Sequence, residues 1–226
     1  MELLRGYRGA TRAFFERDVL EVAPELLGAL LLRTDAEGTV GIRITEVEAY
    51  AGERDPGAHS YRGKTKRNQS MFGAAGHIYC YFTYGLHHAI NLVCSDIDQP
   101  YGCLIRAGEI VIGADLARSR RERLPRKHPI PEAGLARGPG NVTQSFAVTL
   151  KNDGDDLFSS SVETGLEDYA SWQFLLPETP PQNEILKGPR IGVNGEGGNP
   201  ERFPWRFWLD NEPSVSASRT AKPLFG

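Results

Sequence analysis

The stretch from Thr39 to Ala51, TVGIRITEVEAYA, constrains the fold of this chain more than any other segment. Its β-branched and aromatic residues predict a long strand, and the Gly- and Pro-containing residues 52–57 predict the loop that follows. Two carboxylates, Glu46 and Glu48, stand in the second half of this strand. A buried carboxylate destabilises a fold unless it is paired or used in chemistry. The fold must therefore provide partners or a task for both groups.

Side chains alternate between the two faces of a strand. This alternation predicts that one face carries Ile42, Ile44, Glu46, Glu48 and Tyr50, and that the other carries Arg43, Thr45, Val47 and Ala49. If the isoleucine face is buried, both carboxylates are buried with it. Pairing with an arginine such as Arg106 is one interpretation for either group. Glu48 is the stronger candidate for a site, because it lies at the strand end beside a loop.

Several further segments predict secondary structure. Strands are expected at 77–85, 89–96 and 102–110, with edge strands at 188–193 (GPRIGV) and 204–209 (PWRFWL). A helical pattern begins near Ala10, breaks near Pro24 and resumes as a second short helix that runs into a strand. Residues 112–123 predict a basic helix, and 124–148 predict a loop followed by a helix. The predicted fold is α+β: one domain over residues 1–226, with a curved, mainly antiparallel β-sheet surrounded by helices and long loops.

Composition narrows the function classes. The 226 residues are 40% hydrophobic, and no apolar run is long enough to span a membrane. The first residues lack a signal-peptide pattern, so we expect a cytoplasmic protein with three reduced cysteines. Net charge is −3 overall, yet residues 61–127 carry +6, while 1–60 carry −4 and the remainder −5. The basic middle is either an ordinary solvated surface or a face that binds a polyanion.

Two sequence features that follow the long 52–76 loop indicate where a ligand could bind: a run of aromatic residues and a polar residue within an apolar strand. In HIYCYFTYG, Tyr79 and Tyr81 are expected on one face, and Phe82 and Tyr84 on the other. Strand aromatics are usually core residues, but hydroxyl-bearing rings beside a basic loop also suit stacking on nucleobases. Asn91 lies in the apolar segment AINLVCS, where a buried amide needs a hydrogen-bond partner. The amide is expected to hydrogen-bond either another group of the protein or a ligand.

Taken in order, the motifs EVEAY, AHSYRG, KRNQSMF, IYCYFTYGLHHAINLV and LIRAGE resemble the human-type alkyladenine (3-methyladenine) DNA glycosylases. The motifs ARGPGNVTQSFAV, GPRIGV and WRFWL extend the resemblance toward the C-terminus, so that it covers about Phe14 to Leu209. It implies a monofunctional enzyme that flips alkylated or deaminated purines out of duplex DNA and hydrolyses the N-glycosidic bond. It implies no cofactor and no metal.

The resemblance also implies roles for individual residues. Glu48 matches the general base that activates water, and Arg106 matches an arginine that holds this water. Tyr50 would stack on one side of the flipped base, with His59 and Tyr81 on the other side. Flipping is required because a stacked base keeps its glycosidic bond out of reach.

Further roles concern recognition of DNA. Tyr84 matches the side chain that fills the space left by the flipped nucleotide, and Asn91 matches the residue that excludes guanine. The predicted DNA contacts are Tyr84, Leu86, His87, Arg62, Lys64, Lys66 and Arg67. The basic segments RGKTKR and RSRRER are expected to meet phosphates. The partner is thus double-stranded DNA with damaged purines, bound by a monomer on the nucleoid of a bacterium or in a eukaryotic nucleus.

Three other interpretations stay open on the sequence alone. A damage-binding protein without catalysis would keep the basic loop but not need Glu48 and Arg106. A nucleoside hydrolase could use Glu46 and Glu48 as an acid–base pair, although a free nucleoside needs no basic surface. A structural nucleic-acid module would be insensitive to the change Glu48→Gln.

Overall fold

In a computed structural model of the chain, β3 (Gly38–Ala51) is the central strand of the sheet. The structure describes residues 4–83, 85, 87–96, 98–123, 127–159, 171–216 and 222–223. β3 pairs along its length with β6 (Tyr101–Ile112), while its other edge is shared. Strand β2 (Leu30–Asp35) takes the first half of that edge, and β9 (Arg206–Leu209) takes the second half.

The remaining strands extend this sheet on both sides, and every strand pairing within the described residues is antiparallel. The main order is β1-β7-β2-β3-β6-β5-β4, and β8 and β10 continue from β9. The further bounds are β1 Tyr7–Gly9, β4 Ile78–Thr83, β5 His87–Cys94, β7 Ser171–Pro177, β8 Ile185–Gly188 and β10 Lys222–Pro223.

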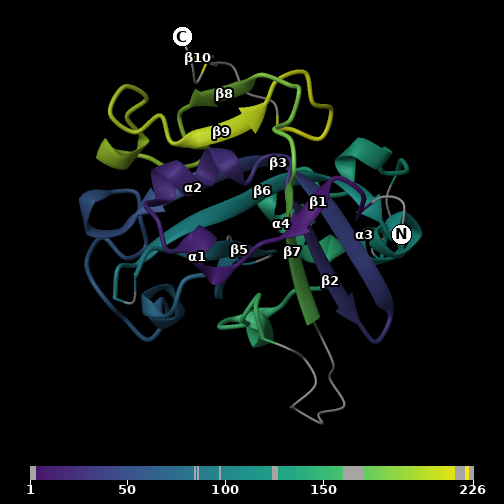
Figure 1. The fold of residues 1–226 in the computed structure, drawn as a ribbon, viewed down its shortest axis with the longest axis horizontal. Helices are drawn as coiled ribbons and strands as arrows, with labels where there is room; N and C mark the ends of the chain where they lie inside the picture. Colours follow the sequence, from purple (N-terminus) through teal and green to yellow (C-terminus); the bar gives the residue numbers. More distant parts are fainter. Residues whose placement is uncertain are drawn as a thin grey trace.

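In the described part of the chain, four α-helices accompany the sheet: α1 Arg12–Phe15, α2 Val19–Glu25, α3 Ala114–Arg121 and α4 Pro139–Ser145. Short 3-10 helices are η2 Gly52–Arg54, η3 Gln69–Phe72, η4 Glu132–Gly134, η5 Leu150–Asn152 and η7 Glu196–Gly198. In Figure 1, α1 and α2 lie in front of the sheet near β5 and β6. The predicted α+β class with a mainly antiparallel sheet is confirmed. Among the described residues, no helix has the length and apolar character to cross a bilayer.

The buried core joins these helices to one face of the sheet. Phe15, Val19 and Val22 from α1 and α2 belong to the same cluster as Ile90 and Ile105 from the sheet. Burial of such side chains is the main stabilising contribution to folding. On each central strand, the residues that alternate with these core residues point to the opposite face of the sheet, and a site can form on that face.

The predicted alternation along β3 is wrong at one point. Ile42 and Ile44 lie in the core, but so do Val47 and Ala49, which were expected on the other face. The reason is a β-bulge at Thr45: Ile44 pairs with Gly108 and Glu46 with Ala107, which leaves Thr45 as an extra residue. The bulge turns the two glutamates away from the isoleucine face without breaking the strand.

Three smaller expectations also need correction. No second helix follows Pro24, since Pro24 lies inside α2 and the chain turns at Gly28 into β2. Residues 188–193 are not an edge strand, because β8 ends at Gly188 and turns follow it. PWRFWL does contain strand β9, but β9 pairs with both β3 and β8 and so is not an edge.

Candidate active site

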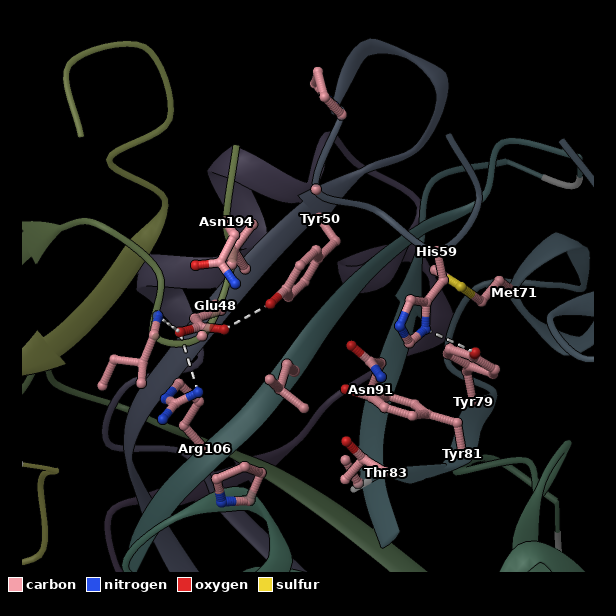
Figure 2. A pocket seen from close by; sticks show the side chains of 18 residues that line it. Glu48, Tyr50, His59, Met71, Tyr79, Tyr81, Thr83, Asn91, Arg106 and Asn194 are labelled. Carbon is pink, nitrogen blue, oxygen red and sulfur yellow. Dashed lines mark hydrogen bonds and ion pairs between the residues drawn. The ribbon is translucent and has the colours of Figure 1, made fainter. Parts of the chain in front are cut away.

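A cavity of about 340 Å³ opens on the face of β3, β6, β5 and β4 that turns away from the core. The strands contribute Glu48, Tyr50, Leu104, Arg106, Ala89, Asn91, Tyr79, Tyr81 and Thr83. The loops and the start of α4 contribute Pro56, Gly57, His59, Met71, Pro139, Ile191, Gly192, Val193 and Asn194. Figure 2 shows Glu48, Tyr50 and Arg106 on one side of this cavity, with His59 and Tyr81 across from them.

Glu48 is the one acidic side chain among the described residues that line the cavity, and two hydrogen bonds and an ion pair hold it at 0% exposure. The Tyr50 hydroxyl donates to Oε2 at 2.7 Å, and the Ile191 N–H donates to Oε1 at 2.7 Å. The Arg106 guanidinium lies 3.1 Å from Oε1. Burial, and then the Glu48 charge, raise the pKa of Tyr50 well above its usual value, so its hydroxyl stays protonated and donates. A carboxylate held in this way suits general-base or electrostatic chemistry.

Glu46 has a different environment, although it lies only two residues away. Its Oε1 accepts from Nε of Arg106 at 2.9 Å and from Nε of Arg206 at 2.6 Å, and its Oε2 accepts from the Ser216 N–H at 2.8 Å. Burial acts to raise the pKa of Glu46, but the two arginines outweigh it and lower the pKa below its usual value. The predicted pairing of Glu46 with Arg106 is confirmed. Glu46 does not line the cavity.

Arg106 connects the two glutamates. Its side chain is 7% exposed and reaches Glu46 through Nε and Glu48 through a terminal nitrogen. Burial acts to lower the pKa of Arg106, but Glu48 and Glu46 together raise it. The guanidinium is therefore a permanent charge in a fixed orientation beside Glu48.

Aromatic rings form the opposite wall. The Tyr79 and Tyr81 rings stack at 5.3 Å between centroids, and the His59 ring meets Tyr81 edge-on at 4.6 Å. His59 Nδ1 and the Tyr79 hydroxyl lie 3.1 Å apart. Burial, and then the charge of Arg67, lower the pKa of His59, which favours a neutral ring at pH 7. A wall of neutral aromatic rings of this kind suits a flat aromatic ligand.

Asn91 brings an unused donor to the floor of the cavity. Its side chain is buried, and its amide nitrogen Nδ2 has no hydrogen-bond partner. Buried polar groups are nearly always partnered, so this exception calls for an explanation. Because Asn91 lines the cavity, a bound ligand is the natural partner for this amide.

The six predicted residues for catalysis and base binding therefore meet in one cavity: Glu48, Arg106, Tyr50, His59, Tyr81 and Asn91. The predicted DNA contacts Arg62, Lys64, Lys66 and Arg67 are exposed on the loop between β3 and β4. His87 packs its ring against α4, where a Cβ at Gly140 would approach the ring to 2.8 Å. Tyr84 and Leu86 lie outside the described residues.

The basic helix α3 does not present all its arginines to a ligand. Arg120 is buried and binds Asp35 through NH2, while Arg121 is buried and donates to the Leu135 carbonyl. The expectation that RSRRER as a whole meets phosphates is wrong for these two residues, because their charges serve contacts inside the protein.

Two loop residues close to Glu48 were not predicted from the sequence. Ile191 contributes a backbone N–H, which no side-chain pattern reveals, and its segment was expected to be a strand. Asn194 lies in the same loop, and Figure 2 shows its amide close to Glu48. Tyr79 was expected on the same strand face as Tyr81, and both tyrosines line the cavity.

Comparison with known proteins gives a consistent result. A family model described as methylpurine-DNA glycosylase matches residues 13–213. A relative from Streptomyces avermitilis is 47% identical over 94% of this chain and 93% of its own length. A relative from Leifsonia xyli is 46% identical over 91% of this chain and 90% of its own length. A relative from Corynebacterium glutamicum strain ATCC 13032 is 43% identical over 88% of this chain and 92% of its own length. All three carry the provisional name 3-methyladenine DNA glycosylase.

The match of the family model covers most of the chain, and so do the relatives. The resemblance drawn from the ordered motifs is thus confirmed, and with it the prediction that the chain is a DNA glycosylase. The chain belongs to the methylpurine-DNA glycosylase family.

Proposed function

We propose that residues 1–226 form one monofunctional glycosylase domain that removes damaged purines from duplex DNA and leaves an abasic site. The substrates are 3-methyladenine, 7-methylguanine, hypoxanthine and ethenoadenine. The observation that carries the proposal is the position of Glu48, a fully buried carboxylate that borders a cavity walled by aromatic rings. The names of the bacterial relatives support the substrate class.

The cavity suits a purine that has left the base stack. The base would lie between the Tyr50 ring and the pair His59 and Tyr81, where its two faces recover stacking. The unpartnered Asn91 amide would meet the edge of the base. An amide at that position crowds the 2-amino group of guanine, which adenine and hypoxanthine lack. The crowding disfavours guanine, which is an abundant competitor of similar size. 7-Methylguanine carries the same 2-amino group, and we propose that it is removed nonetheless because its cationic base leaves easily.

Hydrolysis follows from the surroundings of Glu48. Its carboxylate takes a proton from a water molecule whose oxygen bonds to C1′ of the deoxyribose. The C1′–N bond breaks, and its electron pair leaves with the base. Positive charge grows on the sugar as the bond lengthens, and the carboxylate stabilises this charge. Arg106 is fixed between Glu46 and Glu48 and would orient the water.

Simple hydrolysis fits the composition of the cavity. No lysine is among the described residues that line it, so an amine nucleophile for a Schiff base has no candidate there. Glu46 is enclosed by Arg106, Arg206 and the Ser216 N–H. A nucleoside hydrolase that uses Glu46 and Glu48 as an acid–base pair is therefore disfavoured.

DNA binding would use the exposed basic loop. Arg62, Lys64, Lys66 and Arg67 would contact phosphates. Tyr84 would enter the space left by the base, and its chain neighbours Leu86 and His87 would make further contacts with the DNA. We place the enzyme on the bacterial nucleoid as a monomer.

The test uses duplex oligonucleotides that carry one hypoxanthine or one ethenoadenine. Wild type and Glu48→Gln are incubated with each duplex, and alkali then cleaves abasic sites. Glu109→Gln serves as the matched control, because Glu109 is a half-exposed glutamate on β6 outside the cavity. Strand cleavage by wild type and the control, but not by Glu48→Gln, is the expected result. Cleavage by all three proteins would remove Glu48 from its role. Binding of lesion DNA with no cleavage by any protein, repeated on methylated DNA, would indicate a damage-binding protein.

A further inference from the structure

A buried guanidinium holds together the loops that form one wall of the cavity. The Arg190 side chain is 0% exposed and makes a two-pronged ion pair with the equally buried Asp55, with N···O distances of 2.5 and 2.7 Å. It also donates to the Ala49 carbonyl at 2.9 Å and to the Gly197 carbonyl at 2.8 Å. One side chain thus joins the end of β3, the 55–57 loop and the segment around η7.

The same guanidinium supports the ring of Tyr50. Its central carbon lies 4.5 Å from the centroid of that ring and 5.4 Å from the centroid of Trp205. A cation over an aromatic face is attractive, and more so when both groups are removed from water. Tyr50 lines the cavity and donates its hydroxyl to Glu48, so a contact that fixes the ring also fixes this donor.

Arg190 acts on Glu48 by a second route. The next residue along the chain, Ile191, gives its backbone N–H to Glu48 at 2.7 Å. Because Arg190 is anchored at Asp55 and two carbonyls, the peptide group that follows it has little freedom. Both hydrogen-bond donors to Glu48, the Tyr50 hydroxyl and the Ile191 N–H, are therefore positioned by one arginine that does not line the cavity.

The neighbouring backbone is built around this side chain. Asp55 accepts hydrogen bonds from the N–H groups of Ala51 and Gly57, besides binding Arg190. A Cβ at Gly57 would lie 2.5 Å from a terminal nitrogen of Arg190, so only glycine leaves room for the guanidinium. Gly57 itself lines the cavity. The ion pair thus shapes the loop wall as well as the donors.

We propose that Arg190, with Asp55, is a positioning residue for base excision that keeps Glu48 aimed at the attacking water. The proposal rests on the proposed role of Glu48. Small displacements of a catalytic group slow the chemical step far more than they weaken binding. Replacement of Arg190 should therefore reduce the rate of bond cleavage and leave affinity for lesion DNA nearly unchanged.

A purely structural role predicts a different outcome, and a matched control separates the two. Arg120 is likewise buried, binds both oxygens of Asp35 and donates to a backbone carbonyl. Unlike Arg190, it lies on α3 and its partners Asp35, Glu37 and Ser145 do not line the cavity or contact Glu48. Arg190→Lys and Arg120→Lys should both lower the melting temperature. A structural role for Arg190 would leave the excision rate per folded molecule equal in the two variants.

The experiment measures single-turnover excision of hypoxanthine from a duplex, with enzyme in excess and at a temperature where circular dichroism shows each variant folded. Lesion-DNA affinity is measured by fluorescence anisotropy on the same duplex. Arg190→Lys and Asp55→Asn should slow excision at least tenfold and change Kd less than threefold. Arg120→Lys should stay within twofold of wild type in both.

Each outcome decides between the two roles. An Arg190→Lys rate within twofold of wild type, or equal losses in Arg190→Lys and Arg120→Lys, would overturn the positioning role while the proposed function stands. A Kd that weakens as much as the rate would also overturn it, since Arg190 would then act through binding. Excision by Glu48→Gln at the wild-type rate would overturn the proposed role of Glu48 and, with it, this inference.

Discussion

The change Glu46→Gln tests whether the second carboxylate of β3 serves the fold rather than the chemistry. Glutamine keeps the shape of the side chain but removes the charge that Arg106 and Arg206 share. The glutamine oxygen can still accept from Nε of the 0% exposed Arg206, but the negative charge opposite this guanidinium is lost, and one of its terminal nitrogens already lacks a partner. The new amide nitrogen would also face the Ser216 N–H, which is itself a donor. Removing one member of a buried ion pair costs about 3–5 kcal/mol, because the other charge stays buried and unpaired.

Urea unfolding followed by tryptophan fluorescence measures this cost. With a urea dependence of roughly 2–3 kcal/mol per molar, the loss shifts the midpoint down by roughly 1–2.5 M. Glu109→Gln is the control, since Glu109 is 48% exposed in its pair with Arg43 and such pairs contribute about 0.2–1 kcal/mol. Equal midpoint shifts in the two variants would refute the view that Glu46 holds a buried charge cluster.

The pH dependence gives an independent check with a defined sign. The folded-state pKa of Glu46 lies below its unfolded value of 4.5, because the two arginines outweigh burial. A depressed pKa contributes stability that is complete above the unfolded value and is lost as the pH falls through the folded one. Wild type should therefore lose stability below about pH 4.5 more steeply than Glu46→Gln. Parallel curves for the two proteins would contradict the assignment.

Two further predictions concern the cavity. Tyr50→Phe keeps the ring for stacking but removes the hydroxyl that donates to Glu48. A hydrogen bond to a charged group contributes about 1.5–3 kcal/mol, so the rate of single-turnover excision should fall roughly tenfold or more. The Kd for lesion DNA should stay within threefold of wild type. A Kd that weakens in proportion to the rate would show that the hydroxyl serves binding. Asn91→Ala removes an amide nitrogen that has no partner, so the free energy of unfolding should fall by about 1 kcal/mol or less. In the same variant, release of undamaged guanine from duplex DNA should become measurable. Continued rejection of guanine would remove Asn91 from its proposed role.

The sequence predicted the residues of the site better than it predicted their geometry. Period-two patterns identify the strands that carry Glu48, Arg106 and Asn91, because alternation is a local property of the backbone. The bulge at Thr45 could not be predicted, since it depends on how β3 and β6 pair across about sixty residues of chain. The same limit applies to Ile191, whose N–H reaches Glu48 over a separation of 143 residues.

The contrast between Glu46 and Glu48 shows why residue type alone does not assign a role. Both are fully buried on one strand, two positions apart, and both contact Arg106. Glu46 pairs with a second buried arginine, Arg206, and lies outside the cavity, so its charge stabilises the fold and does not face a ligand. Glu48 receives neutral donors besides its shared arginine and borders the cavity, so its carboxylate stays available to a ligand. What separates a structural carboxylate from a chemical one here is the second set of partners: Arg206 and Ser216 from distant segments for Glu46, and the nearby Tyr50 with the distant Ile191 for Glu48.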